Sequence, residues 1–347
     1  MILLTIRDLQ HRALRFVVVI LLAAVVFSML FVMTGLVEQF QREPHLTTDG
    51  FGASGWVVAD GVSGPFTSGS ALSVSAAADI DADTVAPAVV ARSSIRRDGA
   101  PEAVILVGHG VGELGSPAVD DGRAASASGE LVVDRTLEAD LGDRIEVVGR
   151  SFEVVGISDD TTVLAGVPLV FMVLADAQQL AFQTEAVVSL VLVDGEVRST
   201  PPGTTVMTSD AVAQNALEPL EGAVASVDLV RVLLWFVAAV LIGAVVYLSA
   251  LDRIRDFAVL KAIGASNGGL MAGLAIQAVL VALCSVAVAS VIQLFLAPMF
   301  PLKVTVPARA FLQIPVIAVV LALVGGAAGM RKVAASDPAL AFAGAGG

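Results

Sequence analysis

The stretch FVVVILLAAVVFSMLFVMTGLV, residues 16–37, decides the architecture because its 22 residues include no charge. Three further charge-free apolar runs follow at residues 232–251, 262–302 and 310–330, and the longest of them contains a span-length part at about 270–295. A helix rises 1.5 Å per residue, so about 20 residues cross a hydrocarbon core roughly 30 Å thick. Buried helices of soluble proteins are usually shorter and keep a polar stripe, so the four runs predict four transmembrane helices.

The charge of the chain is divided as unevenly as its hydropathy. The 347 residues are 56% hydrophobic and 15% charged, with a net charge of −13. Residues 38–228 hold 29 acidic and 9 basic side chains, a balance of −20, whereas the rest of the chain carries +7. The predicted fold class is therefore an α-helical membrane protein with four transmembrane helices in a 1+3 layout and an α+β extracytoplasmic domain between helices 1 and 2. The acidic surface argues against nucleic acid as a partner, since phosphate binding needs clustered Lys and Arg.

The basic residues outside the inserted domain predict the orientation of the chain in the membrane. They precede the first run, separate the second from the third and follow the fourth: Arg7, Arg12, Arg15, Arg253, Arg255, Lys261, Arg331 and Lys332. The positive-inside rule places all three segments, and both termini, in the cytoplasm. The first run is longer than the apolar part of a cleaved signal peptide and lacks a small-x-small cleavage site, which favours an uncleaved anchor.

These observations predict nine segments. They are a cytoplasmic amphipathic helix (1–15), span 1 (16–37), the extracytoplasmic domain (38–228), span 2 (229–251), a cytoplasmic coupling helix (252–267), span 3 (268–297), an outer loop (298–309), span 4 (310–330) and a cytoplasmic tail (331–347). Gly325 and Gly326 in the fourth span suggest a close helix contact, and a dimer face is one place for it. Gln277, Gln293 and Gln313 indicate packing or a single interhelical hydrogen bond each.

The inserted domain reads as short Val- and Ile-rich strands separated by Gly- and Ser-rich breaks such as residues 48–55. Residues 144–157 predict a hairpin that turns at Gly149 and Arg150. Helices are expected at 134–140, at 174–182 and at 209–225, the last with a kink at Pro219.

Candidate catalytic and metal-binding residues are few in the inserted domain. His109 lies in a glycine-rich segment that reads as a loop at the end of a strand. Asp79, Asp81 and Asp83 alternate like part of a calcium loop, but the Gly and Glu of that motif are missing, so a solvated acidic turn is expected. Cys284, the single cysteine, has no partner for an intrachain disulfide. No catalytic, cofactor-binding or metal site is predicted, and a membrane enzyme is the least favoured interpretation.

The most informative cytoplasmic stretch is RIRDFAVLKAIGAS, residues 253–266. Ile254, Phe257, Leu260 and Ile263 recur every three residues and predict one broad apolar stripe on a short helix, which Gly264 ends. Such a stripe suits either an interfacial helix without a partner or docking into a groove of a soluble protein.

This stretch resembles the coupling region of the MacB/LolC/LolE/DevC/FtsX-like ABC transporter permeases, also called type VII or mechanotransmission ABC proteins. In that family the string Arg-x-Arg-Glu-Phe/Ile-x-x-Leu-Lys/Arg-Ala-Ile/Leu-Gly-Ala follows the second span, and Asp256 stands here in place of the usual Glu. The tail RKVAASDPAL, residues 331–340, is similar to the family's Ala-x-x-Asp-Pro-Ala ending. The fragments LVVD, LGDRI and FEVVGI, which begin at Leu131, Leu141 and Phe152, resemble its periplasmic core domain.

The resemblance implies a permease subunit of an ABC transporter at the bacterial inner (plasma) membrane, with no enzymatic activity of its own. It implies a separate ATPase subunit that binds ATP and Mg²⁺, a second permease copy (the same chain or a paralogue), membrane lipid, and an envelope protein or exported substrate as partners. No lysine here is followed by Ser or Thr, so the chain has no Walker A motif. The alternative function is an FtsX-like scaffold that regulates a cell-wall hydrolase. The implied ATPase-coupling residues are Arg253, Arg255, Asp256, Phe257, Ala258, Val259, Leu260, Lys261, Ala262, Ile263 and Gly264.

Overall fold

A computed structural model describes residues 13–97, 100–252, 254–300 and 302–334. The chain divides into two compact units: the first comprises Met1–Glu38 and Ala225–Gly347, and the second comprises Gln39–Val224. Nearly all of the expected amphipathic helix (1–15) and the tail beyond residue 334 lie outside the described residues.

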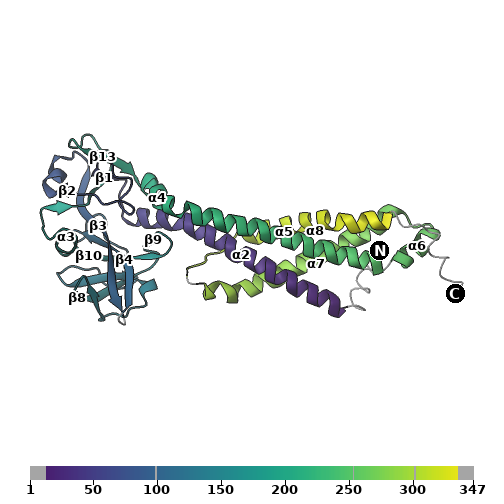
Figure 1. Cartoon of the computed structure of the whole chain (residues 1–347). Helices are drawn as coiled ribbons and strands as arrows, with labels where there is room; N and C mark the ends of the chain where they lie inside the picture. The colour runs from purple at the N-terminus through teal and green to yellow at the C-terminus, as the bar shows by residue number, and fades with distance from the viewer. Residues whose placement is uncertain (1–12, 98–99, 253, 301, 335–347) are drawn as a thin grey trace. The chain divides into compact units, whose positions relative to one another are not determined.

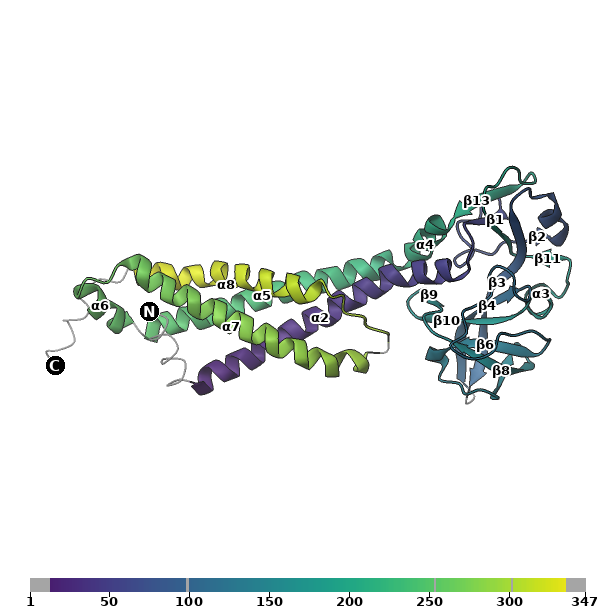
Figure 2. The same cartoon turned by 180° about the vertical axis from the view of Figure 1, so that it is seen from behind.

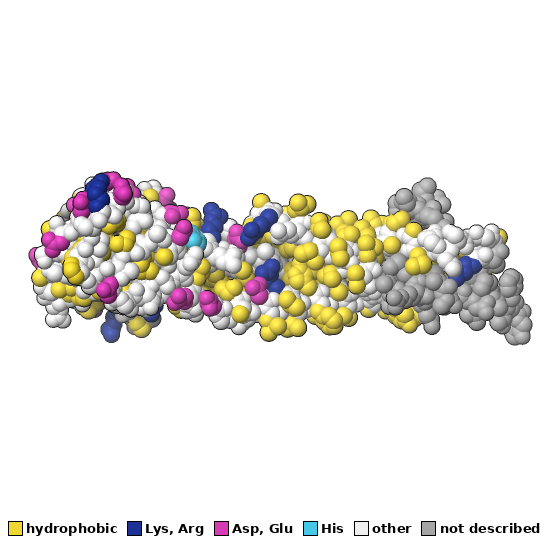
Figure 3. All heavy atoms as spheres, turned by 90° about the horizontal axis from the view of Figure 1, so that it is seen from above, with side chains coloured by type: hydrophobic (Ala, Val, Ile, Leu, Met, Phe, Trp, Pro, Cys, Tyr) yellow, Lys and Arg dark blue, Asp and Glu magenta, His cyan; other side chains and the backbone are white. Residues whose placement is uncertain are grey.

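The first unit is a bundle of long apolar helices. Figures 1 and 2 show four of them side by side: α2 (Ala13–Gly50), α5 (Glu221–Asp252), α7 (Asn267–Leu296) and α8 (Ala310–Ala334), with the short α6 (Ile254–Ala262) between α5 and α7 and a single 3-10 turn (Ala297–Met299) after α7. Three segments are long and apolar enough to cross a membrane, namely Phe16–Gly50, Ser209–Asp252 and Asn267–Met299, while the apolar part of α8 with described side chains, Ala310–Gly325, is shorter. Hydrophobic side chains cover these helices, as a lipid-facing surface requires, and acidic ones gather over the second unit (Figure 3).

Small residues bring the helices of this bundle close together. A methyl group at Gly243 of α5 would lie 2.7 Å from the carbonyl oxygen of Gly325 in α8, and one at Gly325 would lie 2.6 Å from the carbonyl oxygen of Ala239. The predicted close contact at Gly325 is therefore made within the chain, against α5. Gln277 of α7 donates its Nε2 hydrogen to Ser249 Oγ of α5 at 3.0 Å, the kind of single interhelical hydrogen bond that was expected.

The second unit is an α+β domain built on one long mixed sheet. The strand order is β13-β1-β12-β3-β4-β10-β6-β8-β5, with β7 beside β3 and β8, and β9 beside β10. The pairs β10–β4 and β6–β8 are parallel, and β2 and β11 form a separate pair. The strands are β1 (Gly55–Ala59), β2 (Leu72–Ser73), β3 (Thr84–Arg97), β4 (Ala100–His109), β5 (Asp121–Gly122), β6 (Glu130–Asp134), β7 (Arg144–Val147), β8 (Arg150–Ser158), β9 (Thr162–Val163), β10 (Val167–Val173), β11 (Val187–Val188), β12 (Leu190–Asp194) and β13 (Thr204–Thr208).

Two apolar layers cover the faces of this sheet. One layer includes α3 (Leu174–Phe182), whose Ala177 is fully buried. The other includes α4 (Ser209–Leu217) and an aromatic cluster in which the ring centroids of Phe51 and Trp56 are 4.8 Å apart. The alternation of buried residues along β3 and β4 supplies both layers, as expected for a sheet that is covered on both faces.

Several predicted elements are confirmed and others are corrected. The helix at 174–182 is present as α3, and Pro219 lies in a 3-10 turn (Glu218–Leu220) between α4 and α5, where the kink was expected. The expected helix at 134–140 is only the 3-10 turn Arg135–Leu137, because Asp134 accepts hydrogen bonds from Thr136 and Thr161 and fixes a tight turn. The expected break at 48–55 begins later, since α2 continues to Gly50.

Candidate coupling surface

The short helix α6 follows α5 and is ended by a well-defined local motif. The N–H of Ala265 donates to the carbonyl of Leu260 at 2.8 Å, and the N–H of Gly264 donates to the carbonyl of Lys261 at 3.0 Å. These two bonds form a Schellman motif, and the φ of +98° at Gly264 is a conformation that favours glycine. Ser266 then caps α7 by accepting the N–H of Gly269 at 3.2 Å. The predicted stop at Gly264 is confirmed.

The apolar residues of α6 do not form one accessible stripe, which corrects the prediction. Phe257 is only 6% exposed and belongs to the core of the helix bundle, and Leu260 and Ala265 pack against that core. Ile263, in contrast, is 76% exposed. A step of three residues falls about 60° short of a full helical turn. Phe257, Leu260 and Ile263 therefore pass around about a third of the helix, from the bundle to the outside.

Among the described side chains of α6 and of the turn that follows it, the exposed ones are Asp256, Val259 and Ile263, and we call this set the α6 outer face. Val259 is 51% exposed, so two branched apolar side chains stand beside one carboxylate. Lys261 is half-buried. Arg253 lies outside the described residues, and the side chains of Arg255, Ala258 and Ala262 do as well. The structure thus separates the predicted set into an anchoring side, led by Phe257, and the α6 outer face.

His109 is the most conspicuous buried polar residue of the second unit. Its ring is 1% exposed, its Nδ1 lies 2.8 Å from the carbonyl of Gly110 and 3.1 Å from Ser116 Oγ, and it packs edge-on against Phe171. Burial lowers the pKa of the ring, which holds it neutral. These contacts close the loop that follows β4, in agreement with the loop interpretation. No group of three or more His, Cys, Asp or Glu side chains suited to a metal ion occurs among the described residues.

The acidic residues of this unit hold its loops in place. Arg198 donates to Asp81 at 3.0 Å and to Asp83 at 2.6 Å, so the predicted acidic turn is paired with arginine. Arg123 lowers the pKa of the Glu130 carboxyl to about 2 through a two-pronged hydrogen bond.

Three buried carboxylates, Glu43, Asp134 and Asp176, were not singled out in the sequence interpretation. Asp176 is 4% exposed and accepts hydrogen bonds from Ser128 Oγ, from the Gly129 N–H and from Arg150. Asp134 fixes the turn after β6, and Glu43 accepts the N–H of Gly166. For Asp134, its position just before Thr136 was a local sign that it caps a turn. The other hydrogen-bond donors to these carboxylates lie far away in the sequence, so no local pattern indicated them.

Comparisons with known proteins identify the family. A family model for the C-terminal part of FtsX-like permeases matches residues 229–338, a region that includes α6. An uncharacterized ABC transporter permease of Mycobacterium tuberculosis is 42% identical over 354 residues, covering 99% of this chain and 100% of that protein. The chain belongs to the FtsX-like family of ABC transporter permeases. A second such permease of the same species is 38% identical over 353 residues, with 99% of this chain and 100% of that protein covered.

Two solved structures are similar to part of this FtsX-like permease. One is the extracellular domain of the noncanonic ABC-type transporter YknZ from Gram-positive bacteria, with a TM-score of 0.32, 16% identity, and coverage of 40% of this chain and 90% of that one. The other is the periplasmic region of MacB from Actinobacillus actinomycetemcomitans, with a TM-score of 0.34, 13% identity, and coverage of 49% and 95%. The family model includes residues 253–266, and the 42% identical relative is similar along 99% of this chain. Together they confirm the family resemblance.

Proposed function

We propose that this permease couples ATP hydrolysis in a separate ATPase subunit to movement of its extracytoplasmic domain, for export or for mechanical signalling at the cell envelope. The proposal includes four membrane spans, cytoplasmic termini, a second permease copy, and ATP with Mg²⁺ bound by the ATPase. The observation that carries it is the division of α6 into an anchored side and an exposed apolar side. An ABC transporter permease requires an ATPase partner, and α6 offers a surface suited to one.

The anchoring of α6 explains how a force could pass from a docked subunit to the bundle. Phe257 is seated among the core side chains of the bundle, so a displacement of α6 must displace the helices around it. The α6 outer face has the composition of a small docking knob, with Ile263 and Val259 exposed and Asp256 beside them. Exposed apolar side chains rimmed by polar groups are typical of protein interfaces.

The helix α2 gives the movement a route to both units. In the first unit the segment 304–306 lies so close to α2 that a methyl group at Gly35 would come within 2.8 Å of Val304, and Arg309 pairs with Glu38. In the second unit Thr47 donates its hydroxyl to the carbonyl of Thr162 at 2.5 Å. Glu43 accepts the N–H of Gly166 at 2.8 Å. The last turns of α2 are thus hydrogen-bonded to β9 and to the segment that connects β9 with β10, and a shift of α2 would be passed to both.

Introduction of a negative charge on the α6 outer face tests the proposal. Ile263→Asp and Val259→Asp should each lower recovery of the co-expressed ABC ATPase subunit on the tagged permease by about 30-fold, the loss of a contact worth about 2 kcal/mol. Val111→Asp is the matched control, because Val111 is 61% exposed in the second unit and should leave recovery unchanged.

A variant of the anchoring residue separates docking from folding. Phe257→Ala should lower the unfolding temperature and yield of the permease itself, since a buried Phe→Ala change costs about 3–5 kcal/mol. The two aspartate variants should keep wild-type yield. Normal recovery of the ATPase with both Ile263→Asp and Val259→Asp would disprove docking through the α6 outer face.

A further inference from the structure

Strand β3 is longer than the strands beside it, and this leaves part of one edge open. It has 14 residues, and β4 pairs with residues 89–97 along one edge. β12 pairs with residues 84–88, and β7, which must use the edge opposite β4, pairs only with Ile95 and Arg96. Among the described strands, none pairs with residues 90–94 on the edge opposite β4.

The backbone groups of this open edge form a regular row. The N–H of Val90 donates to Ser189 Oγ at 2.5 Å, just before β12 begins, so it points away from β4. Alternate residues of a strand direct their N–H and C=O groups to the same edge. The carbonyl of Val90, both groups of Arg92 and the N–H of Ser94 therefore face the opening. They span about 13 Å at about 3.3 Å per residue, room for a strand of about four residues.

A cavity of about 330 Å³ lies along this open edge, and we call it the β3 groove. Residues 90–93 of β3 form its floor, the loop 65–70 lines one side and the end of α3 lines the other. Phe66 belongs to the apolar layer on one face of the sheet, and Leu180 and Phe182 pack against the layer on the other face. An extended segment added to β3 would therefore direct alternate side chains toward two different walls.

Val148 stands at the β7 end of the groove in a conformation that its residue type disfavours. It lines the cavity, is 61% exposed and has a φ of +49°. Together with Gly149, at a φ of +77°, it forms the two-residue turn between the paired Val147 and Arg150. Such turns favour Asn and Gly, and a β-branched residue with positive φ is strained. A strained and exposed apolar side chain at the mouth of a groove is a pattern of binding sites.

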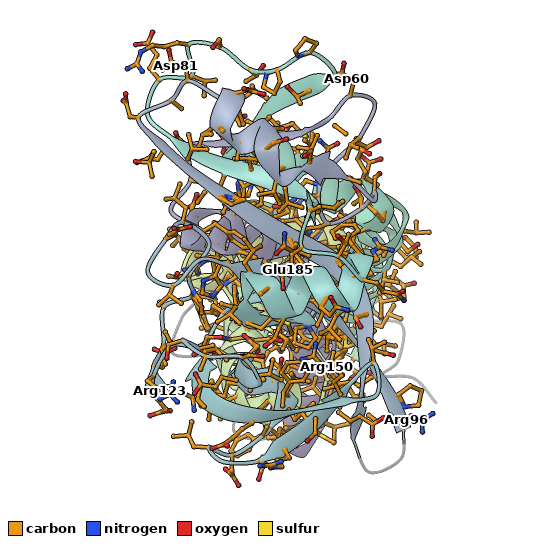
Figure 4. The ribbon with its side chains drawn as sticks, turned by 90° about the vertical axis from the view of Figure 1, so that its left-hand side faces the viewer. Asp60, Asp81, Arg96, Arg123, Arg150 and Glu185 are labelled. Atoms are coloured by element: carbon orange, nitrogen blue, oxygen red, sulfur yellow. The ribbon has the colours of Figure 1, made fainter. Side chains whose placement is uncertain are left out.

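The charge of the groove is opposite to that of its surroundings. Of the described residues that line it, Arg92 alone is charged, and its Nε donates to the carbonyl of Phe66 at 3.1 Å. Farther along, Arg96 stands opposite Glu146 in the strand register, and Arg150 pairs with Asp176; Arg96 and Arg150 are labelled in Figure 4. The domain itself carries −20 over residues 38–228. The groove is thus a local cationic site that suits a carboxylate.

We propose that the β3 groove binds an extended peptide segment of a partner protein, which adds to β3 as a short strand between β12 and β7. The segment would place an apolar side chain against Val148 and an acidic one near Arg92. A lipid tail matches this surface less well, because it cannot pair with a row of backbone donors and acceptors. The proposal goes beyond ATPase coupling and does not depend on α6.

Random eight-residue peptides displayed on phage and selected on the full-length permease in nanodiscs provide the probe. Enriched peptides should alternate apolar and polar residues and include an acidic residue. Arg92→Pro removes the central N–H of the open edge and should weaken their binding at least 10-fold. Arg92→Val keeps that N–H and should weaken only acidic peptides, by a few-fold. Recovery of the ATPase subunit should be unchanged in both variants, which separates this test from that of α6.

Val148→Asn provides a second test that does not depend on whether Arg92→Pro folds. Asparagine suits the turn, so the unfolding temperature should rise while peptide affinity falls several-fold. Val111→Asn, an equally exposed valine away from the groove, should leave the affinity unchanged. Failure to enrich peptides with the alternating pattern would overturn the proposal. It would equally be overturned by peptides that bind Arg92→Pro and Val148→Asn as tightly as the unmodified protein.

Discussion

Substitution of Gly108 tests how tightly α3 is seated on the sheet. Gly108 lies in β4 beneath α3, and a methyl group built on it would come within 2.2 Å of the Cβ of Ala177 and 3.4 Å of the Cα of Leu174. Carbon atoms in ordinary contact are about 3.5–4.0 Å apart. Gly108→Ala therefore requires α3 to move away from β4 by about 1.5 Å, because the backbone fixes the position of the buried Ala177 Cβ.

The expected cost follows from overpacking. An extra methyl group in a well-packed core costs about 1–3 kcal/mol. A domain of this size loses about 2–4 °C in unfolding temperature per kcal/mol, so Gly108→Ala should lower that temperature by about 2–12 °C. Ala177→Gly alone should cost about 1 kcal/mol, because glycine is a poor helix former. The double variant exchanges the two methyl positions and should lose only about 1 kcal/mol in total, which is less than the sum of the single losses.

Trp56 provides the measurement, since it is fully buried in the same unit. In a Trp235→Phe background its fluorescence reports the thermal unfolding of the second unit in the detergent-solubilised full chain. Gly108→Ala should unfold earlier, and addition of Ala177→Gly should recover most of the loss. Strict additivity of the two losses, or no loss in Gly108→Ala, would refute the close approach of α3 to β4.

Two further predictions concern orientation and pH. In a Cys284→Ala background, a membrane-impermeant maleimide should label Val111→Cys in intact cells but Ile263→Cys only after permeabilisation; the reverse pattern would contradict the proposed topology. Burial lowers the pKa of His109 in the folded state, so below pH about 6.5 the unfolded chain takes up a proton that the folded chain resists. Stability should therefore fall between pH 7.5 and pH 5.5, and unfolding temperatures of His109→Gln should fall less over the same range; equal falls would contradict the buried neutral ring.

The candidate site shows where reasoning from the sequence stops. The short helix, its end at Gly264 and the family followed from residues that are close together in the chain, because helix caps and motifs are local. The sequence did not predict which side of α6 faces the bundle. Helical geometry places Phe257 and Ile263 about 120° apart, but it does not say which of them faces the bundle; Phe257 is buried there and Ile263 is exposed. Only the packing of α6 against the helix bundle decides which of the two is buried.

The sequence by itself determined the apolar helices of the membrane part, the acidic inserted domain and the class of protein, because hydropathy and charge are summed along the chain and need no partner. Tertiary structure alone decided that Gly325 faces Gly243 and that Asp134 and Asp176 hold loops. It also decided that β3 keeps an open edge beside Val148. Each of these features joins residues that lie far apart in the sequence. Their structural role depends on which strand or helix lies next to them, and no local sequence pattern predicts that neighbour.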